Sequence, residues 1–332
     1  MNIPDVLRIA LTNELTAIPQ KSLAEATTRL SARYRAERSY NEAERLVHSP
    51  VDIAAYAAYR LPATFAAISA VLAEVRQRNP QWQPATLLDA GAGPGTALWA
   101  AHTVWPVLAR VTLLERERAM IDFGKRLAAH ADAAALRAAT WQQHDLLEPW
   151  EHAPCDLVIM AYALGELPLP RLNEMIARLW SVTGGTLVLL EPGTPAGFAL
   201  IRQARQQLID AGGHVIAPCP HQEACPMPDN DWCHFAQRVA RTALHRQVKQ
   251  ATLSYEDEKF SYVAVSRLPV SPLVGRVLRH PQVRPGHIYL DLCTPNGLRH
   301  PIVTRKDRAA FREARDLRWG DAVSEAFHDA II

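Results

Sequence analysis

Residues 87–96 read LLDAGAGPGT, and this stretch decides the fold class. An apolar run ends in Asp89, the glycines Gly91, Gly93 and Gly95 follow, and a helical pattern begins directly afterwards. Glycines allow a tight turn between a strand and a helix, and they let a ligand approach where a Cβ atom would stand in the way. The stretch therefore predicts a strand–loop–helix unit that holds a nucleotide-like cofactor, with an ordinary tight turn as the alternative.

The spacing of these glycines distinguishes between cofactors. It is D-x-G-x-G-x-G, whereas the dinucleotide fingerprint is G-x-G-x-x-G, so the loop favours a class I methyltransferase domain that binds S-adenosylmethionine. Glu115 ends the second apolar run, where a carboxylate can accept hydrogen bonds from both ribose hydroxyls. Asp145 follows the third predicted strand, where such enzymes hold the adenine amine. The alternative for Asp145 is a helix N-cap or a turn.

Short apolar runs alternate with helical patterns around the loop. The runs at 110–115, 155–162 and 185–192 predict buried strands, and the alternation indicates an α/β, Rossmann-like fold with a parallel sheet and crossover helices. Residues 1–80 carry apolar residues at helical spacing. Three regions are therefore predicted: a helical region at 1–80, a methyltransferase core at 81–214, and a Cys-rich, basic extension at 215–332 with a basic helix after residue 235 and several strands.

The extension contains four of the five cysteines, Cys219, Cys225, Cys233 and Cys293. Thiolates that meet in space bind Zn²⁺ or an iron–sulfur cluster. The first three are separated by five and seven residues, which matches neither common zinc knuckles nor the ferredoxin pattern. The sequence thus predicts a metal-bearing, strand-containing extension and leaves the metal open. The alternative is that these residues are small buried apolar side chains, as we expect for Cys155.

Two further roles are open to the Cys-rich segment at residues 217–235. His221 and His234 offer alternative metal ligands. The prolines on either side of Cys219 also resemble the setting of the cysteine nucleophile in RNA cytosine methyltransferases. A thiolate cannot both bind a metal and attack a base, so the nucleophile and ligand hypotheses for Cys219 exclude each other.

The charge distribution limits the classes of partner. The formal net charge is +2, so a nucleic-acid surface must come from local clustering. Residues 267–318 carry eleven Lys or Arg against four Asp or Glu, which suits a phosphate backbone, with a solvated face as the alternative. No uncharged apolar run of about 18 residues occurs, and no signal-peptide pattern is present, so we expect no membrane span and a cytoplasmic protein.

The loop after the fourth predicted strand carries no decisive catalytic group. It reads AYALGELP at residues 161–168 and lacks the Asn/Asp-Pro-Pro-Tyr motif of exocyclic-amine methyltransferases. Tyr162 and Glu166 are candidates to line the pocket, and a loop that covers the cofactor is the better interpretation. The catalytic residues are therefore left unassigned.

Several motifs occur in an order that resembles a known family. RLPATFAA, the glycine loop, YALGELP, LLEPGTPAGF, APCPH, WCHF, YEDEKFSY, LDLCTPNG and RWGD follow one another within residues 45–321. In this the chain is similar to the Rsm-type family of bacterial proteins and mitochondrial methyltransferase-like assembly factors of the small ribosomal subunit. The resemblance implies that a [4Fe-4S] cluster is held by Cys219, Cys225, Cys233 and Cys293. It also implies that the partner is small-subunit rRNA or the pre-ribosomal small subunit.

These observations predict an S-adenosylmethionine-binding protein that acts on the small ribosomal subunit as an rRNA methyltransferase and assembly factor. One alternative is a non-catalytic, rRNA-binding assembly factor with a [4Fe-4S] cluster. Another is a small-molecule methyltransferase, which leaves the arginine-rich end without a role.

Overall fold

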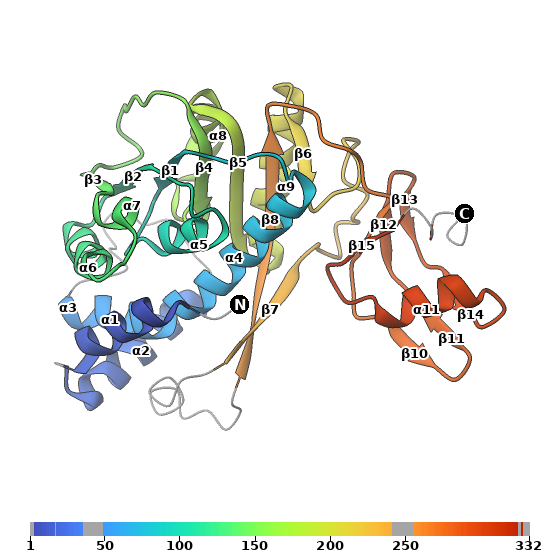
Figure 1. Ribbon diagram of the computed structural model, residues 1–332, viewed down its shortest axis with the longest axis horizontal. Helices are drawn as coiled ribbons and strands as arrows, with labels where there is room; N and C mark the ends of the chain where they lie inside the picture. The colour runs from blue at the N-terminus through green and yellow to red at the C-terminus, as the bar shows by residue number, and fades with distance from the viewer. Residues whose placement is uncertain (1–2, 17, 36–48, 241–254, 325–326, 328–332) are drawn as a thin grey trace.

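The computed structural model describes residues 3–16, 18–35, 49–240, 255–324 and 327 of the chain. Its centre is an eight-stranded sheet in the order β3-β2-β1-β4-β5-β8-β6, with β7 paired to β8 (Figure 1). The strands are β1 (Thr86–Ala90), β2 (Arg110–Glu115), β3 (Thr140–Gln143), β4 (Cys155–Ala161), β5 (Thr183–Pro192), β6 (His214–Ala217), β7 (Phe235–Ala240) and β8 (Tyr255–Ser266).

The sheet is buried on both faces because apolar residues alternate between its two sides. Leu87 packs into a cluster with the N-terminal helices and α5, whereas Leu88 packs against α8 and α9 on the opposite face. β3, β2, β1, β4 and β5 run parallel, as predicted. The connecting helices are α5 (Thr96–Val104), α6 (Arg118–Ala129), α7 (Ala134–Arg137), α8 (Leu172–Ser181) and α9 (Pro195–Asp210).

The sheet also uses strands that lie far along the chain. β8 is antiparallel to both β5 and β6 and lies between them, so the predicted boundary at residue 214 divides one sheet. The basic helix predicted after residue 235 is wrong over Ala236–Ala240, which belong to β7, and the rest of it lies outside the described residues. Pairing of Phe235 with Phe260 of β8 buries both rings, and this long-range contact overrides the local helical pattern.

The N-terminal region is helical, as predicted. It contains α1 (Asp5–Thr16), α2 (Gln20–Arg35), α3 (Pro50–Tyr59) and α4 (Leu61–Arg78), and α4 runs diagonally across the sheet toward β7 and β8 (Figure 1). Among the described residues no single helix has the length and composition to cross a membrane, although α3 and α4, bent by 48°, pass that test as a pair.

The last described segment forms a small unit beside the main sheet (Figure 1). Its strands make two sheets, ordered β10-β11-β14 and β13-β12-β9-β15. Ile288, Leu292 and Val303 form its core with residues of α11. Its elements are β9 (Gly275–Val277), β10 (Gln282–Arg284), β11 (His287–Tyr289), β12 (Leu292–Thr294), β13 (Gly297–Arg299), β14 (Ile302–Thr304), α11 (Arg308–Asp316) and β15 (Ala322–Val323).

A buried arginine on β9 joins this unit to the rest of the chain. Arg276 is 1% exposed, and its Nη2 lies 2.6 Å from Glu74 Oε1 on α4. Its Nε donates to the carbonyl of Pro218 at 2.9 Å, and its Nη1 donates to the carbonyl of Gly320 at 2.7 Å. Three segments that are distant in sequence therefore meet at one guanidinium.

Replacing this arginine is expected to destabilise the fold strongly. Arg276→Met leaves Glu74 and two carbonyl oxygens without their donor, and breaking a buried ion pair in this way costs about 3–5 kcal/mol. Arg238→Met is the matched control, because the side chains of the Arg238–Asp257 pair are 63% and 40% exposed, and solvent screens such a surface pair so that its loss is expected to change stability little. Urea unfolding of both variants gives the comparison. Equal losses of free energy of unfolding would contradict a special role for Arg276.

Candidate cofactor pocket and cysteine cavity

A pocket lies where the carboxyl ends of β1, β2 and β4 meet the helices α3 and α4. Its wall includes Asp89, Gly91 and Gly93 from the first strand and loop, and Glu115 from the end of β2. The sequence predicted these four residues as cofactor ligands, and the structure brings them together. Ligands of open α/β sheets bind at this edge, outside the carboxyl ends of the strands.

The three glycines have different surroundings, although all have positive φ. A Cβ atom on Gly91 would lie 2.8 Å from the Cβ of Ala163, in the loop after β4. Gly95 does not line the pocket, and a Cβ there would come within 2.8 Å of the Trp141 ring. Gly95 therefore serves the packing of α5 against the sheet, and Gly91 serves the close approach of two loops.

Asp89 is a buried carboxyl group in the pocket wall. It is 2% exposed, and its Oδ2 atom has no hydrogen-bond partner among the described residues. Burial, followed by the negative charge of Glu115, raises the pKa of Asp89 to about 8. An unpaired buried acceptor is costly, so this atom is suited to a ligand that brings a donor or a positive charge.

Glu115 holds the glycine loop in place by hydrogen bonds. Its Oε2 accepts a hydrogen bond from the Gly93 N–H at 2.8 Å, and its Oε1 accepts one from the Glu117 N–H at 2.8 Å. Burial raises the pKa of Glu115, and these two N–H donors oppose that shift. Each carboxylate oxygen can accept a second hydrogen bond, so Glu115 can still receive ligand hydroxyls.

Asp145 lies apart from this group. Its Oδ1 accepts a hydrogen bond from the Leu147 N–H at 2.9 Å. Such a bond is typical of a turn, which is the alternative role expected for Asp145 from the sequence. Asp145 is not among the residues that line the pocket.

The helical region and the loop after β4 supply wall residues that the motifs did not assign. Tyr56 and Thr64, from α3 and α4, line the pocket together with Tyr162 and Glu166. Thr64 belongs to the RLPATFAA stretch, which is the one sequence signal that could have identified this wall. Tyr56 had no such signal, because its proximity arises only when the helices fold over the sheet.

Tyr162 has a strained backbone conformation that is stabilised by contacts of its side chain. Its φ is +59°, which is rare for a residue with a side chain, and such conformations persist where the surroundings enforce them. Its hydroxyl donates to Glu258 Oε1 at 3.1 Å, and Arg60 pairs with the same carboxylate at 2.9 Å. Burial, followed by the charge of Glu258, raises the pKa of Tyr162, so the hydroxyl stays protonated and donating.

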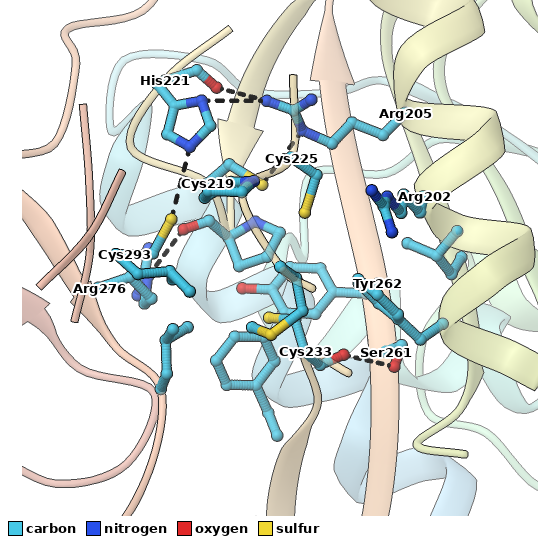
Figure 2. Close-up of a pocket in the computed structure, with 18 residues that line it drawn as sticks. Arg202, Arg205, Cys219, His221, Cys225, Cys233, Ser261, Tyr262, Arg276 and Cys293 are labelled. Atoms are coloured by element: carbon cyan, nitrogen blue, oxygen red, sulfur yellow. Dashed lines mark hydrogen bonds between the residues drawn. The ribbon is translucent and has the colours of Figure 1, made fainter. Parts of the chain in front are cut away.

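The four cysteines of the extension meet at a second cavity. Figure 2 shows Cys219, Cys225, Cys233 and Cys293 around one cavity. Its wall is formed by α9, by the Cys-rich loop at residues 218–234 and by β12. Cys155 is buried on β4 outside this cavity, as expected.

Polar contacts reach two of these thiols. The Nε of Arg205 donates to Cys219 Sγ at 3.2 Å, and Nε2 of His221 lies 3.4 Å from Cys293 Sγ (Figure 2). His221 therefore lies in this cavity as well, whereas His234 stacks on Trp232 away from it. The cavity is thus lined by four thiols, the imidazole of His221 and the guanidinium groups of Arg202, Arg205 and Arg276.

Burial raises the pKa of the thiols in the cavity. Burial and the neighbouring cysteines raise the pKa of Cys293 to about 12, and the same causes raise the pKa of Cys233. In Cys219, burial raises the pKa and Arg205 opposes it. Cys219 does not line the cofactor pocket, so both its place and its ionisation oppose the nucleophile hypothesis.

The thiols are close to one another without forming a mononuclear site. In the described part of the chain, no three His, Cys, Asp or Glu side chains are placed to hold one metal ion. The donor set nevertheless fits a thiolate-bound group, because four cysteines surround one cavity and Arg205 provides positive charge beside them.

Comparison with known proteins places this geometry in a family. A family model described as "Mitochondrial small ribosomal subunit Rsm22" matches residues 50–324. The human "Ribosome assembly protein METTL17, mitochondrial" is 34% identical over 306 residues, which cover 86% of this chain and 63% of that protein. The Schizosaccharomyces pombe "Rsm22-cox11 tandem protein 2, mitochondrial" is 26% identical over 335 residues, which cover 85% of this chain and 44% of that protein. The chain spans less than two thirds of the length of both relatives.

Among solved structures, the chain is similar to an O-methyltransferase family protein from Burkholderia thailandensis. That match has a TM-score of 0.45 and 16% identity, and it covers 74% of this chain and 69% of that one. The chain has the predicted Rossmann-like α/β fold, with a parallel sheet extended by the antiparallel strand β8. Because the family model extends from α3 to β15 and includes both the pocket and the cysteine cavity, the chain belongs to the Rsm22 family.

Proposed function

We propose that this protein binds S-adenosylmethionine and assists the assembly of the small ribosomal subunit. The observation that carries the cofactor proposal is the buried, unpaired Asp89 oxygen in a pocket that also contains Glu115 and the glycine loop. S-adenosylmethionine brings a sulfonium and an ammonium group, which suit Asp89, and ribose hydroxyls, which suit Glu115. The names of the family and of its human member support the ribosomal role.

Methyl transfer to rRNA is the finer proposal. It is supported by the place of Tyr162 and Glu166, which line the pocket beyond β4, where a methyl acceptor would enter. The non-catalytic alternative is favoured by a different observation: Glu258 already holds the Tyr162 hydroxyl, so that hydroxyl is not free to act on an acceptor.

We also propose that Cys219, Cys225, Cys233 and Cys293 hold a [4Fe-4S] cluster. A tetrahedral zinc site with bonds of about 2.3 Å needs its sulfurs about 3.8 Å apart, and the described residues contain no such group. A cluster is larger than one ion and accepts thiolates that are farther apart. When bound, the cluster would cross-link the Cys-rich loop to β12, and Arg205 would offset part of its negative charge.

The cofactor proposal is tested by titrating the full chain with S-adenosylmethionine. Glu115→Ala is expected to weaken binding by about 1.5–3 kcal/mol, since charged hydrogen bonds contribute that much, and this corresponds to about 10- to 150-fold in Kd. Asp145→Ala is the control, because Asp145 lies outside the pocket and its loss is expected to leave Kd unchanged. Absence of binding to the wild-type chain would refute the proposal. A large loss of affinity in Asp145→Ala would instead support the adenine contact predicted for Asp145.

The cluster proposal is tested by iron, zinc and acid-labile sulfide analysis of protein purified without oxygen. We expect about four irons and four sulfides per chain. Cys293→Ser is expected to lower both contents, whereas Cys155→Ser is the matched control, since Cys155 is a buried cysteine outside the cavity. One zinc without sulfide would support the zinc alternative instead of the cluster. A folded sample that contains neither metal would refute the proposal.

The ribosomal role is tested in cells that lack the protein. We expect immature small subunits to accumulate, and small-subunit rRNA is then mapped for methyl groups in the presence and absence of the protein. A methyl group that disappears in the deletion supports transfer, whereas an unchanged map beside immature subunits supports the non-catalytic factor. Normal small-subunit assembly would contradict the role itself.

A further inference from the structure

The three-stranded sheet of the C-terminal unit has two chemically different faces. Cross-strand pairing aligns Gln282 with Tyr289 and Ile302, and Arg284 with His287 and Thr304. Side chains alternate between the faces of a strand, so these six residues share one face. The other face carries Ile288 and Val303, which are buried with α11.

The first face is exposed, and none of the described helices packs on it. Tyr289 is 39% exposed and Ile302 is 57% exposed, although both are large apolar side chains. We call this surface, formed by Gln282, Arg284, His287, Tyr289, Ile302 and Thr304, the strand platform. A groove runs along it, and Arg284, His287, Tyr289 and His300 are among its lining residues.

Two rings on the strand platform are held in a fixed arrangement. His287 and Tyr289 are two residues apart on β11, and their centroids are 5.1 Å apart at an angle of 83°. Ladder pairing to β10 and β14 fixes the backbone on both sides of these rings. A flat base can therefore stack on an exposed ring without the loss of side-chain freedom that a mobile loop would entail.

The charges around the platform favour a polyanion. Arg284 lies on the platform, and Arg305 and Lys306 follow β14 directly, all of them exposed. The neighbouring carboxylates are engaged: Asp291 pairs with His300 at 2.7 Å, and Asp307 caps α11 by accepting from the N–H groups of Ala309 and Ala310. These contacts do not remove the carboxylate charges, but the three cations outnumber the two carboxylates, so the net local charge beside the exposed rings is positive.

We propose that the strand platform binds unpaired nucleotides of RNA, with bases stacked on Tyr289 and His287 and a phosphate at Arg284. The inference rests on the proposed ribosomal role and names the surface and the state of the RNA. Exposed rings on a sheet beside cations are the physical requirements for binding single strands, whereas a duplex hides its bases from such rings.

The test compares the full chain and its Tyr289→Ala variant for binding to a uridine homopolymer and to an RNA duplex of equal length. We expect the wild type to prefer the single strand. Tyr289→Ala is expected to weaken that binding about 5- to 150-fold, because stacking contributes about 1–3 kcal/mol per base. Tyr289→Phe keeps the ring and is expected to retain the wild-type affinity.

Two further variants separate stacking from fold and from charge. Val283→Ala alters an exposed residue of the same sheet outside the strand platform, so its affinity is expected to match the wild type. Arg284→Ala is expected to reduce the slope of log affinity against log salt by about 0.7, the value for one lost phosphate contact on a single strand.

The outcomes distinguish this inference from the function on which it rests. Equal affinity of wild type and Tyr289→Ala for the single strand would overturn the platform and leave the ribosomal role intact. Loss of small-subunit binding in Tyr289→Ala with unchanged oligonucleotide binding would also overturn it, because the surface would then contact protein. A wild-type chain that binds neither the oligonucleotide nor small subunits would refute the ribosomal proposal as well.

Discussion

The buried guanidinium of Arg276 is the interaction on which the arrangement of the chain depends. A cation that is 1% exposed must be fully paired, because its desolvation is otherwise uncompensated. Its partners come from α4, from the loop that begins at Pro218, and from the turn at Gly320. This charge and the oxygens around it therefore hold the C-terminal unit to the main sheet, together with the Arg279–Asp231 ion pair and the hydrogen bond from Trp319 to the carbonyl of His234.

This constraint links the two candidate sites physically. α4 carries Glu74, the partner of Arg276, and about two to three turns earlier the same helix places Ile68 and Thr64 in the wall of the cofactor pocket. The carbonyl of Pro218 lies next to Cys219, which lines the cysteine cavity. Both sites therefore share contacts with the same helix, whose buried face packs against the sheet.

Strand β8 is the second element that joins distant parts of the chain. It completes the main sheet between β5 and β6, and it carries Glu258 behind Tyr162 and Tyr262 beside the cysteine cavity. The loop after β4 can hold Tyr162 at positive φ because Glu258 and Arg60 fix its hydroxyl. One long strand therefore contributes to the pocket, to the cavity and to the core of the fold.

The parallel strands, their crossover helices and the glycine loop could be predicted from the sequence, because periodicity and glycine spacing are local properties of the chain. It also identified Asp89 and Glu115, since each ends a strand of that pattern. Three features could not be predicted and are seen only in the folded chain: β8 lies between β5 and β6, Asp145 is in a turn, and α3 and α4 close the pocket. These features arise from pairing and burial between residues far apart in the chain, for which local pattern carries no signal.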